Sequence, residues 1–252
     1  MNAIFVTALA FAGIFGAAML GMRLRLVLPE HQLSEETKDT IRLGMGLVAT
    51  MTALLLGLLI ASAKGSYDTQ RSQVILLAGK VGYLERVLTV YGPDTAESIS
   101  FLRVSNDTLV NKLWSDESSP ESQVDPTVSE GHELLSSIHK LSPQSEEQRY
   151  LKIEALDAVA DIARTRWLLV AQSDTSIPRP LLTLVIVWLT VIFLSVGLFA
   201  PTNKTVVVTM VIVSLLVASA LFLILELDRP FDGVIQTSSA PLRNAMRDQS
   251  SP

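Results

Sequence analysis

The chain of 252 residues has no cysteine and only three histidines. Without cysteine, it cannot be a secreted scaffold held together by disulfide bonds. The sequence also lacks a nucleophile elbow, a phosphate-binding loop and any His–acid spacing typical of a metal site. We therefore expect no enzymatic activity and no cofactor, while the presence of a metal ion is left undetermined.

Charge is also scarce, because Asp, Glu, Lys and Arg make up 18% of the chain and mean hydropathy is +0.40. Four stretches have no charged residue at all: 3–21, 43–63, 181–203 and 205–225. Each is about 20 residues long, which as a helix spans a hydrocarbon core of about 30 Å. These continuous apolar runs exclude a disordered chain, an ordinary cytosolic enzyme and a barrel of alternating strands. The sequence predicts an all-α integral membrane protein with four transmembrane helices.

The four apolar stretches contain no ionisable side chain, and no proline breaks a span into half-helices. Proton relays and ion-coupled carriers usually need such groups inside the membrane. A coupled small-solute transporter is therefore the least favoured reading. A passive pore or a structural membrane protein fits better.

The charge lies mainly between the second and third spans. Residues 64–179 contain 12 basic and 17 acidic residues, whereas the rest of the chain contains eight of each. We expect four regions: spans one and two (1–63), an acidic helical bundle (64–179), spans three and four (180–226) and a C-terminal tail (227–252). An acidic insert does not suit nucleic acid, which needs a basic face.

The orientation in the membrane follows from the basic residues near the span ends. More Lys and Arg flank the spans on the side of the insert and termini than on the loop side, so we expect that side to be cytoplasmic. The first span favours the opposite orientation, because no basic residue precedes it and Arg23 and Arg25 follow it.

One long helix is predicted from Ser34, a good N-cap, through the second span and into the insert. After the span, apolar residues continue at helical spacing: Val74, Leu77, Val81, Leu84 and Leu88. The helix is expected to end near Tyr91, with Gly92 as its C-cap and Pro93 opening the next element.

The rest of the insert is expected to contain helices over about 94–114, 128–141 and 146–172. The polar segment 115–127 contains two prolines and is predicted to be a loop. Ser145 and Gln148 have the spacing of a capping box, which marks the start of the last helix.

Small residues recur every four positions in the second span, at Ala49, Ala53, Gly57 and Ala61. Such a stripe lets helix backbones approach closely in lipid. It could pack within one chain, pack between chains, or line a pore where small side chains leave room. Thr50 and Thr52 add hydroxyls that either bond their own backbone or contact a passing ion.

Charged residues gather after the fourth span, where Glu226, Asp228 and Arg229 lie close in sequence. They form either an interfacial clamp or a cation site or gate, since hard cations bind carboxylate oxygens. Arg166, near the end of the insert, either anchors the chain at the membrane interface or meets these acids. In the second case Asp68 could join the same layer, which would couple the insert to the spans.

The run 225–231 (LELDRPF), followed by 241–243 (PLR), is the most specific of several segments that together resemble the bacterial bestrophin-like family of membrane proteins. The resemblance covers nearly the whole chain. The other segments that carry it are 43–50 (LGMGLVAT), 57–64 (GLLIASAK), 165–169 (TRWLL) and 197–201 (GLFAP).

This resemblance implies kinship with bestrophins, which are pentameric anion channels whose second spans line the pore. By that analogy, the candidate pore-lining residues are Thr50, Thr52, Leu56 and Ile60. The second span has no aromatic residue for a bestrophin-like constriction, and an acidic insert would repel anions. The sign of the conducted ion is therefore open.

We expect a homo-oligomeric ion channel of the bacterial inner membrane, a pentamer by analogy, with the bilayer and inorganic ions as its partners. The alternative is a non-conducting scaffold or sensor that binds a partner protein through the acidic insert.

Overall fold

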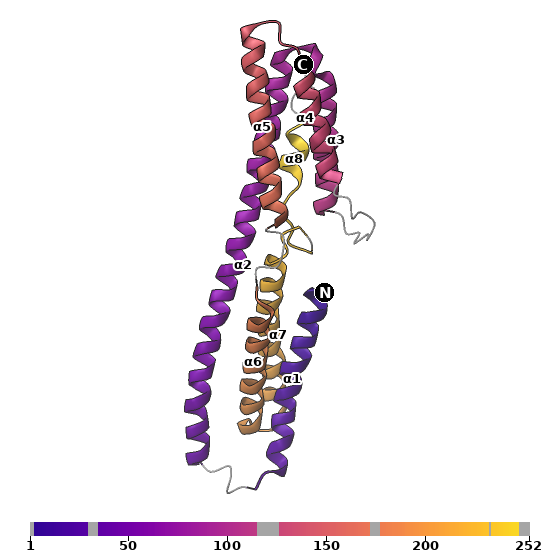
Figure 1. The fold of residues 1–252 in the computed structure, drawn as a ribbon. Helices are drawn as coiled ribbons and strands as arrows, with labels where there is room; N and C mark the ends of the chain where they lie inside the picture. The colour runs from indigo at the N-terminus through magenta and orange to yellow at the C-terminus, as the bar shows by residue number, and fades with distance from the viewer. Residues whose placement is uncertain (1–2, 30–34, 115–125, 172–176, 232, 247–252) are drawn as a thin grey trace. The chain divides into compact units, whose positions relative to one another are not determined.

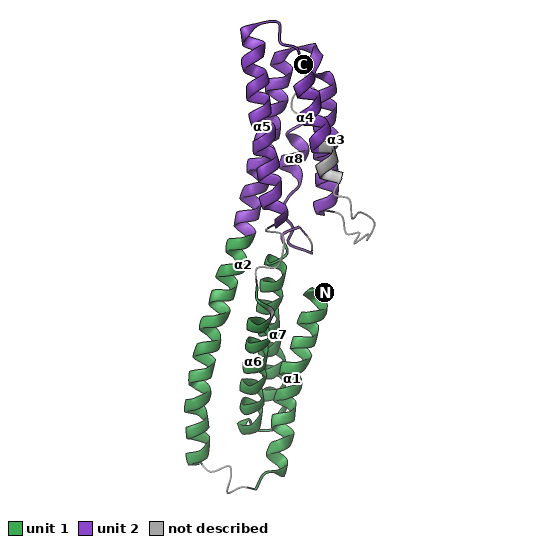
Figure 2. Ribbon diagram, viewed as in Figure 1, with its two compact units in different colours: residues 1–66, 175–229 green, residues 67–174, 230–252 purple. Residues whose placement is uncertain are grey.

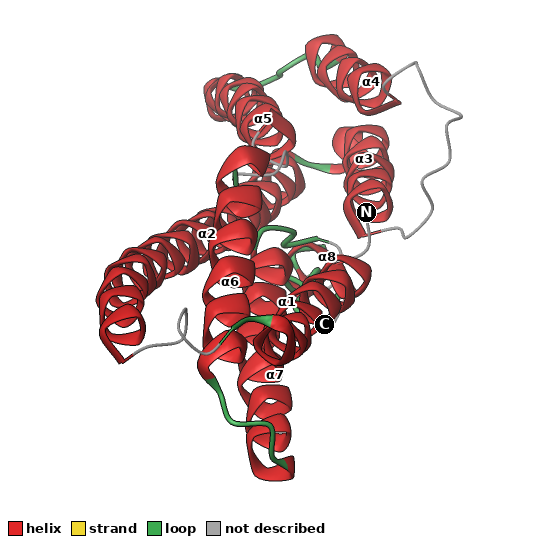
Figure 3. Cartoon of the chain, turned by 90° about the horizontal axis from the view of Figure 1, so that it is seen from below, coloured by secondary structure: helices red, strands yellow, loops and turns green. Residues whose placement is uncertain are grey.

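The computed structural model describes residues 3–29, 35–114, 126–171, 177–231 and 233–246. Over these residues the chain forms helices and no strand, as Figure 3 shows. The α-helices are α1 (Ala3–Val27), α2 (Glu35–Tyr91), α3 (Ala96–Trp114), α4 (Pro126–Lys140), α5 (Glu146–Ala171), α6 (Arg179–Phe199), α7 (Lys204–Leu227) and α8 (Ala240–Asn244). A short 3-10 helix, η2 (Pro93–Thr95), follows α2. Figure 1 shows their order along the chain.

Four of these helices are long and apolar enough to cross a membrane by length and composition: α1, α2, α6 and α7. They contain the four charge-free stretches of the sequence. The chain divides into two compact units, which Figure 2 distinguishes by colour. Unit 1 comprises Met1–Ser66 and Thr175–Arg229, and unit 2 comprises Tyr67–Asp174 and Pro230–Pro252. Helix α2 belongs to both units.

The predicted ends of α2 and α5 follow from local sequence signals. Gly92 has a φ of 128°, so a residue without a Cβ ends α2 as expected. The Ser145 hydroxyl accepts a hydrogen bond from the Gln148 N–H at 3.1 Å, which confirms half of the capping box. The Gln148 side chain accepts from the Gln144 N–H instead of closing the box on Ser145. The expected N-cap Ser34 and most of the 115–127 loop lie outside the described residues.

Unit 2 has its own apolar core, as the periodicity of α2 predicts. The five α2 residues from Val74 to Leu88 that recur at helical spacing are almost completely buried. They pack with apolar residues of α3, α4 and α5, among them Leu102, Leu109, Ile138 and Ile162. This burial is the main stabilising term for the extramembrane bundle.

The C-terminal residues 230–231 and 233–246 belong to this bundle, whereas the sequence predicted a C-terminal tail over 227–252. Phe231 packs edge-on against Trp114, with ring centroids 5.1 Å apart. The Trp114 indole N–H donates to the Thr237 carbonyl at 2.6 Å, and the Asn106 amide donates to the Leu242 carbonyl at 3.1 Å. Aromatic packing and hydrogen bonds from side chains of α3 to backbone carbonyls therefore hold the segment against α3.

Unit 1 depends on very close packing between α1 and α6. A Cβ on Gly197 would lie 2.1 Å from the Ala18 carbonyl oxygen, and a Cβ on Gly21 would lie 2.2 Å from the Leu194 carbonyl oxygen. Only glycine allows the two backbones to approach this closely, and van der Waals contact is the main attraction between helices in lipid. Helix α7 packs against α1 as well.

We predict that Gly197→Ala destabilises unit 1, because the added methyl must push α6 away from α1. Overpacking of this kind costs about 1–3 kcal/mol, so the melting temperature in detergent should fall. Gly16→Ala is the matched control, since nothing lies within 4 Å of a Cβ built on Gly16. Equal melting temperatures for the two variants would contradict the close crossing.

Phe231→Ala should release the C-terminal segment from the bundle, because it removes the ring that packs on Trp114. Phe→Ala in a core costs about 3–5 kcal/mol. Limited proteolysis of the full-length protein should then cut within 233–246 faster than in the wild type. Val234→Ala, at an exposed position, should leave the cleavage rate unchanged. A protected segment in the Phe231 variant would mean that the hydrogen bonds alone hold it.

Candidate functional site

The candidate site is the open face of α2 within its apolar part. One side of this helix packs into unit 1 through Leu59 and Ala63, which are 2% and 0% exposed. The opposite side is exposed along its length and includes Thr50, Gly57 and Ala61. Among the residues that the structure describes, none covers this face.

The small-residue stripe lies on or beside this open face. Ala53, Gly57 and Ala61 are exposed and Ala49 is half-buried. Nothing lies within 4 Å of a Cβ built on Gly57. The stripe therefore takes little part in packing within the chain, and its backbone is accessible to another helix or to a pore.

The four candidate pore-lining residues do not share one side of the helix. Thr50 is exposed on the open face, whereas Thr52 is 2% exposed on the packed side. Leu56 and Ile60 are half-buried and pack partly against the core of unit 1. Both threonine hydroxyls donate to the carbonyl four residues back, Thr50 to Gly46 at 2.9 Å and Thr52 to Val48 at 2.7 Å.

The acidic cluster after the fourth span is largely buried. Glu226 is 3% exposed and Asp228 is 7% exposed. The backbone is also tied there, since the Asp228 N–H donates to the Ile224 carbonyl at 3.2 Å and the Arg229 N–H to the Glu226 carbonyl at 3.1 Å. Carboxyl groups at such low exposure need hydrogen-bonding or charged partners. The groups around this turn must therefore be positioned to supply them.

Arg166 lies in unit 2, on α5, and its guanidinium donates to the Ser105 hydroxyl of α3. Asp68, exposed on α2, also belongs to unit 2, whereas Glu226 and Asp228 belong to unit 1. A coupling layer joining Arg166 and Asp68 to the acids of the fourth span stays a prediction.

Unit 2 carries a polar groove that the sequence reasoning missed. It measures about 410 Å³ and lies between α2 and α5. Lys80 Nζ lies 3.3 Å from Asp161 Oδ2 and 3.0 Å from the Thr165 hydroxyl. The Tyr83 hydroxyl donates to Glu154 at 2.8 Å, and this hydrogen bond raises the pKa of Tyr83 above its ordinary value.

The sequence signal for this groove is the spacing of Glu154, Asp157 and Asp161, which places three carboxylates on one face of α5. Their main neighbours are Lys80 and Arg164, so the groove contains a mixed-charge network. Within the described ranges, no three His, Cys, Asp or Glu side chains gather in a way that would hold a metal ion.

Residues 12–242 match the Bestrophin-like domain. The fold is similar to the crystal structure of a point mutant of a bacterial bestrophin homologue from Klebsiella pneumoniae. The TM-score is 0.65 at 17% identity, over 98% of each chain, and this likeness concerns the fold. No curated protein sequence matches the chain. The family and the four apolar helices place the protein in a membrane. Because the matched domain spans most of its length, the chain belongs to the bestrophin-like family.

Proposed function

We propose that this protein is a homo-oligomeric ion channel of the bacterial inner membrane, in which ions pass passively along a pore lined by α2. The observation that carries the proposal is the open face of α2, which is uncharged throughout the apolar part of the helix and which the described part of the chain leaves uncovered. Family membership and the fold shared with a bacterial bestrophin homologue support it.

The open face has the chemistry of a narrow apolar pore. Gly57 and Ala61 place little side chain on this face, Thr50 supplies one hydroxyl, and exposed leucines such as Leu54 and Leu58 make the rest of it apolar. Apolar constrictions of this kind can gate by expelling water. Thr52 and Leu56 lie on the packed side, so the proposed lining contains Thr50, Gly57 and Ala61, with Ile60 at its edge. Passive conduction agrees with the lack of ionisable groups in the spans.

A homo-oligomer is supported by apolar side chains exposed on unit 2. Ile75, Leu76 and Tyr83 on α2, and Tyr150 and Ile153 on α5, are each at least half exposed. Exposed apolar patches on a solvated bundle usually mark protein interfaces. We propose that copies of this chain cover them, five copies by analogy with bestrophins.

The remaining parts of the proposal concern topology and gating. All four apolar helices would span the membrane, with unit 2 and both termini in the cytoplasm. The buried carboxylates Glu226 and Asp228, with Arg229, would control the end of the pore, and Arg166 and Asp68 would transmit changes from unit 2. Either sign of ion is compatible with this arrangement.

The second candidate is a non-conducting scaffold or sensor whose unit 2 binds a partner protein. The observation in its favour is the same exposed apolar surface on α2 and α5, which a partner could cover as well as another copy. Ion flux and subunit number separate the two functions.

Purified protein in liposomes should release an ion down its gradient, tested separately with chloride, potassium, sodium and calcium. Gly57→Leu should abolish this flux while the oligomer still forms, because a leucine side chain fills the narrow pore. Gly44→Leu is the matched control, since Gly44 is also exposed on α2 with nothing within 4 Å of a Cβ. At about 100° per residue, it points about 140° away from Gly57.

Flux that survives Gly57→Leu would exclude the proposed lining. An absence of flux under every gradient, with an intact wild-type oligomer, would favour the scaffold.

Ile153→Glu should shift the protein from oligomer to monomer, because it places a charge in the proposed interface on α5. Native mass spectrometry or light scattering in detergent would count the subunits. Val234→Glu is the control, being an exposed apolar position outside α2 and α5. If the wild type is itself monomeric, self-association through this surface is excluded.

A further inference from the structure

Unit 1 contains a cleft that the proposed pore does not use. It has a volume of about 260 Å³ and lies between the start of α2 and the end of α6. Its lining residues are Ile41, Arg42, Met45, Ser195, Val196, Phe199 and Ala200. By helical geometry, Ile41 and Met45 lie on the same side of α2 as the buried Leu59, opposite the Gly57 stripe. An occupant of the cleft would therefore lie away from the ion path.

The walls of this cleft are apolar. Met45 and Ile41 face Val196 and Phe199, and Ser195 is the one uncharged polar side chain among the lining residues. Both walls belong to helices apolar enough to span a membrane. Unfilled apolar space forfeits van der Waals contact, and the bilayer supplies acyl chains to any cleft that opens toward it. A hydrocarbon chain is therefore the natural occupant of the interior.

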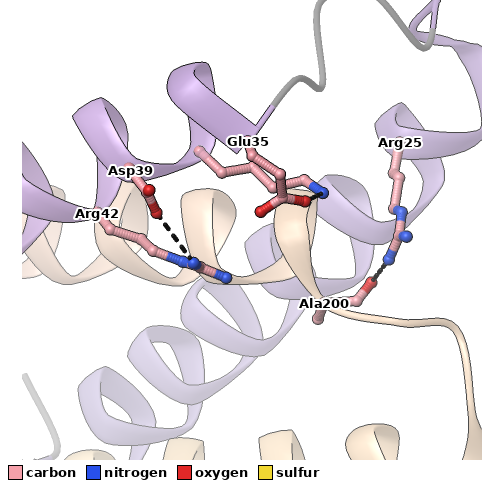
Figure 4. A network of polar contacts seen from close by, with 6 residues as sticks. Arg25, Glu35, Asp39, Arg42 and Ala200 are labelled. Atoms are coloured by element: carbon pink, nitrogen blue, oxygen red, sulfur yellow. Dashed lines mark hydrogen bonds and ion pairs between the residues drawn. The ribbon is translucent and has the colours of Figure 1, made fainter.

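The rim of the cleft is charged, which distinguishes it from an ordinary gap between helices. Arg42 lines it, and its guanidinium lies 3.3 Å from an Asp39 carboxylate oxygen (Figure 4). Both side chains are mostly exposed, at 63% and 69%. On the other wall, the Arg25 guanidinium donates to the carbonyl of Ala200, one of the lining residues (Figure 4). This contact fixes the end of α6 beside the cleft.

The charged groups occur where the apolar part of α2 begins, since Leu43 starts its charge-free stretch. A phospholipid presents its phosphate at this depth, directly above its acyl chains. Guanidinium groups match phosphate oxygens bidentately. Asp39, one turn from Arg42, offers a carboxylate to an ammonium group, which phosphatidylethanolamine carries beside its phosphate.

We infer that this cleft binds one phosphatidylethanolamine molecule. One acyl chain lies between α2 and α6, the phosphate binds Arg42, and the headgroup ammonium binds Asp39. The exposed Arg42–Asp39 pair is weak. The lipid replaces this one ion pair with two contacts, each between groups of opposite charge. The inference requires insertion in a membrane but not ion conduction.

Lipid binding to the full-length, delipidated protein tests the inference directly. The protein in detergent is titrated with phosphatidylethanolamine, phosphatidylglycerol or phosphatidylcholine of identical chains, and bound lipid is counted by native mass spectrometry. The wild type should prefer phosphatidylethanolamine. Arg42→Gln should weaken binding of all three about tenfold, because a charged hydrogen bond to phosphate is lost. Asp39→Asn should remove the preference for phosphatidylethanolamine while phosphatidylglycerol still binds.

Two further variants separate the cleft from general surface charge. Arg23→Gln removes an exposed arginine of α1 that does not line the cleft, and it should leave lipid binding unchanged. Ser195→Phe fills the apolar interior and should weaken binding of all three lipids with Arg42 intact.

Equal binding by the Arg42 and Arg23 variants would overturn the inference. The inference would also be overturned if the wild type bound no lipid and the Ser195→Phe variant had a different subunit number. Another copy of the chain would then occupy the cleft. Because no readout involves flux, a failed channel proposal would not affect the result.

Discussion

The uninterrupted backbone of α2 is the constraint on which the other features depend. A membrane offers no water to backbone groups, so a span must satisfy its hydrogen bonds within its own helix. α2 meets this requirement through its apolar part and then continues as the core-forming helix of unit 2. The same helix therefore has two patterns: charge-free over 43–63, and apolar on one side only from Val74 to Leu88.

Because one side of α2 is used for packing in both units, its other side is not covered by the residues that the structure describes. In unit 2 this side carries Ile75, Leu76 and Tyr83, and in unit 1 it carries Gly57 and Ala61 among exposed leucines such as Leu54 and Leu58. Large apolar side chains favour a protein interface, while small ones leave space. The exposed apolar side chains of unit 2 support the proposed self-association, and the small residues Gly57 and Ala61 support the proposed pore.

The sequence predicted features that depend on neighbouring residues. Gly92 ends α2, Ser145 caps α5, and the Val74–Leu88 periodicity is buried, because each signal acts within one helix or one turn. It did not predict the Gly21–Gly197 crossing or the seating of residues 230–246 on Trp114. These contacts join segments far apart in the chain, and nothing in either segment alone specifies its partner.

The candidate site shows the same limit within a single helix. A four-residue spacing identified the Ala49–Ala61 stripe, but it could not say whether the stripe faces its own chain. Analogy grouped Thr50 with Thr52, although they are two positions apart and a helix turns about 200° over that distance. Only the position of Leu59 and Ala63 in the core of unit 1 decides which threonine is open. The role of a polar residue in a span can therefore be assigned only once the packed side of its helix is known.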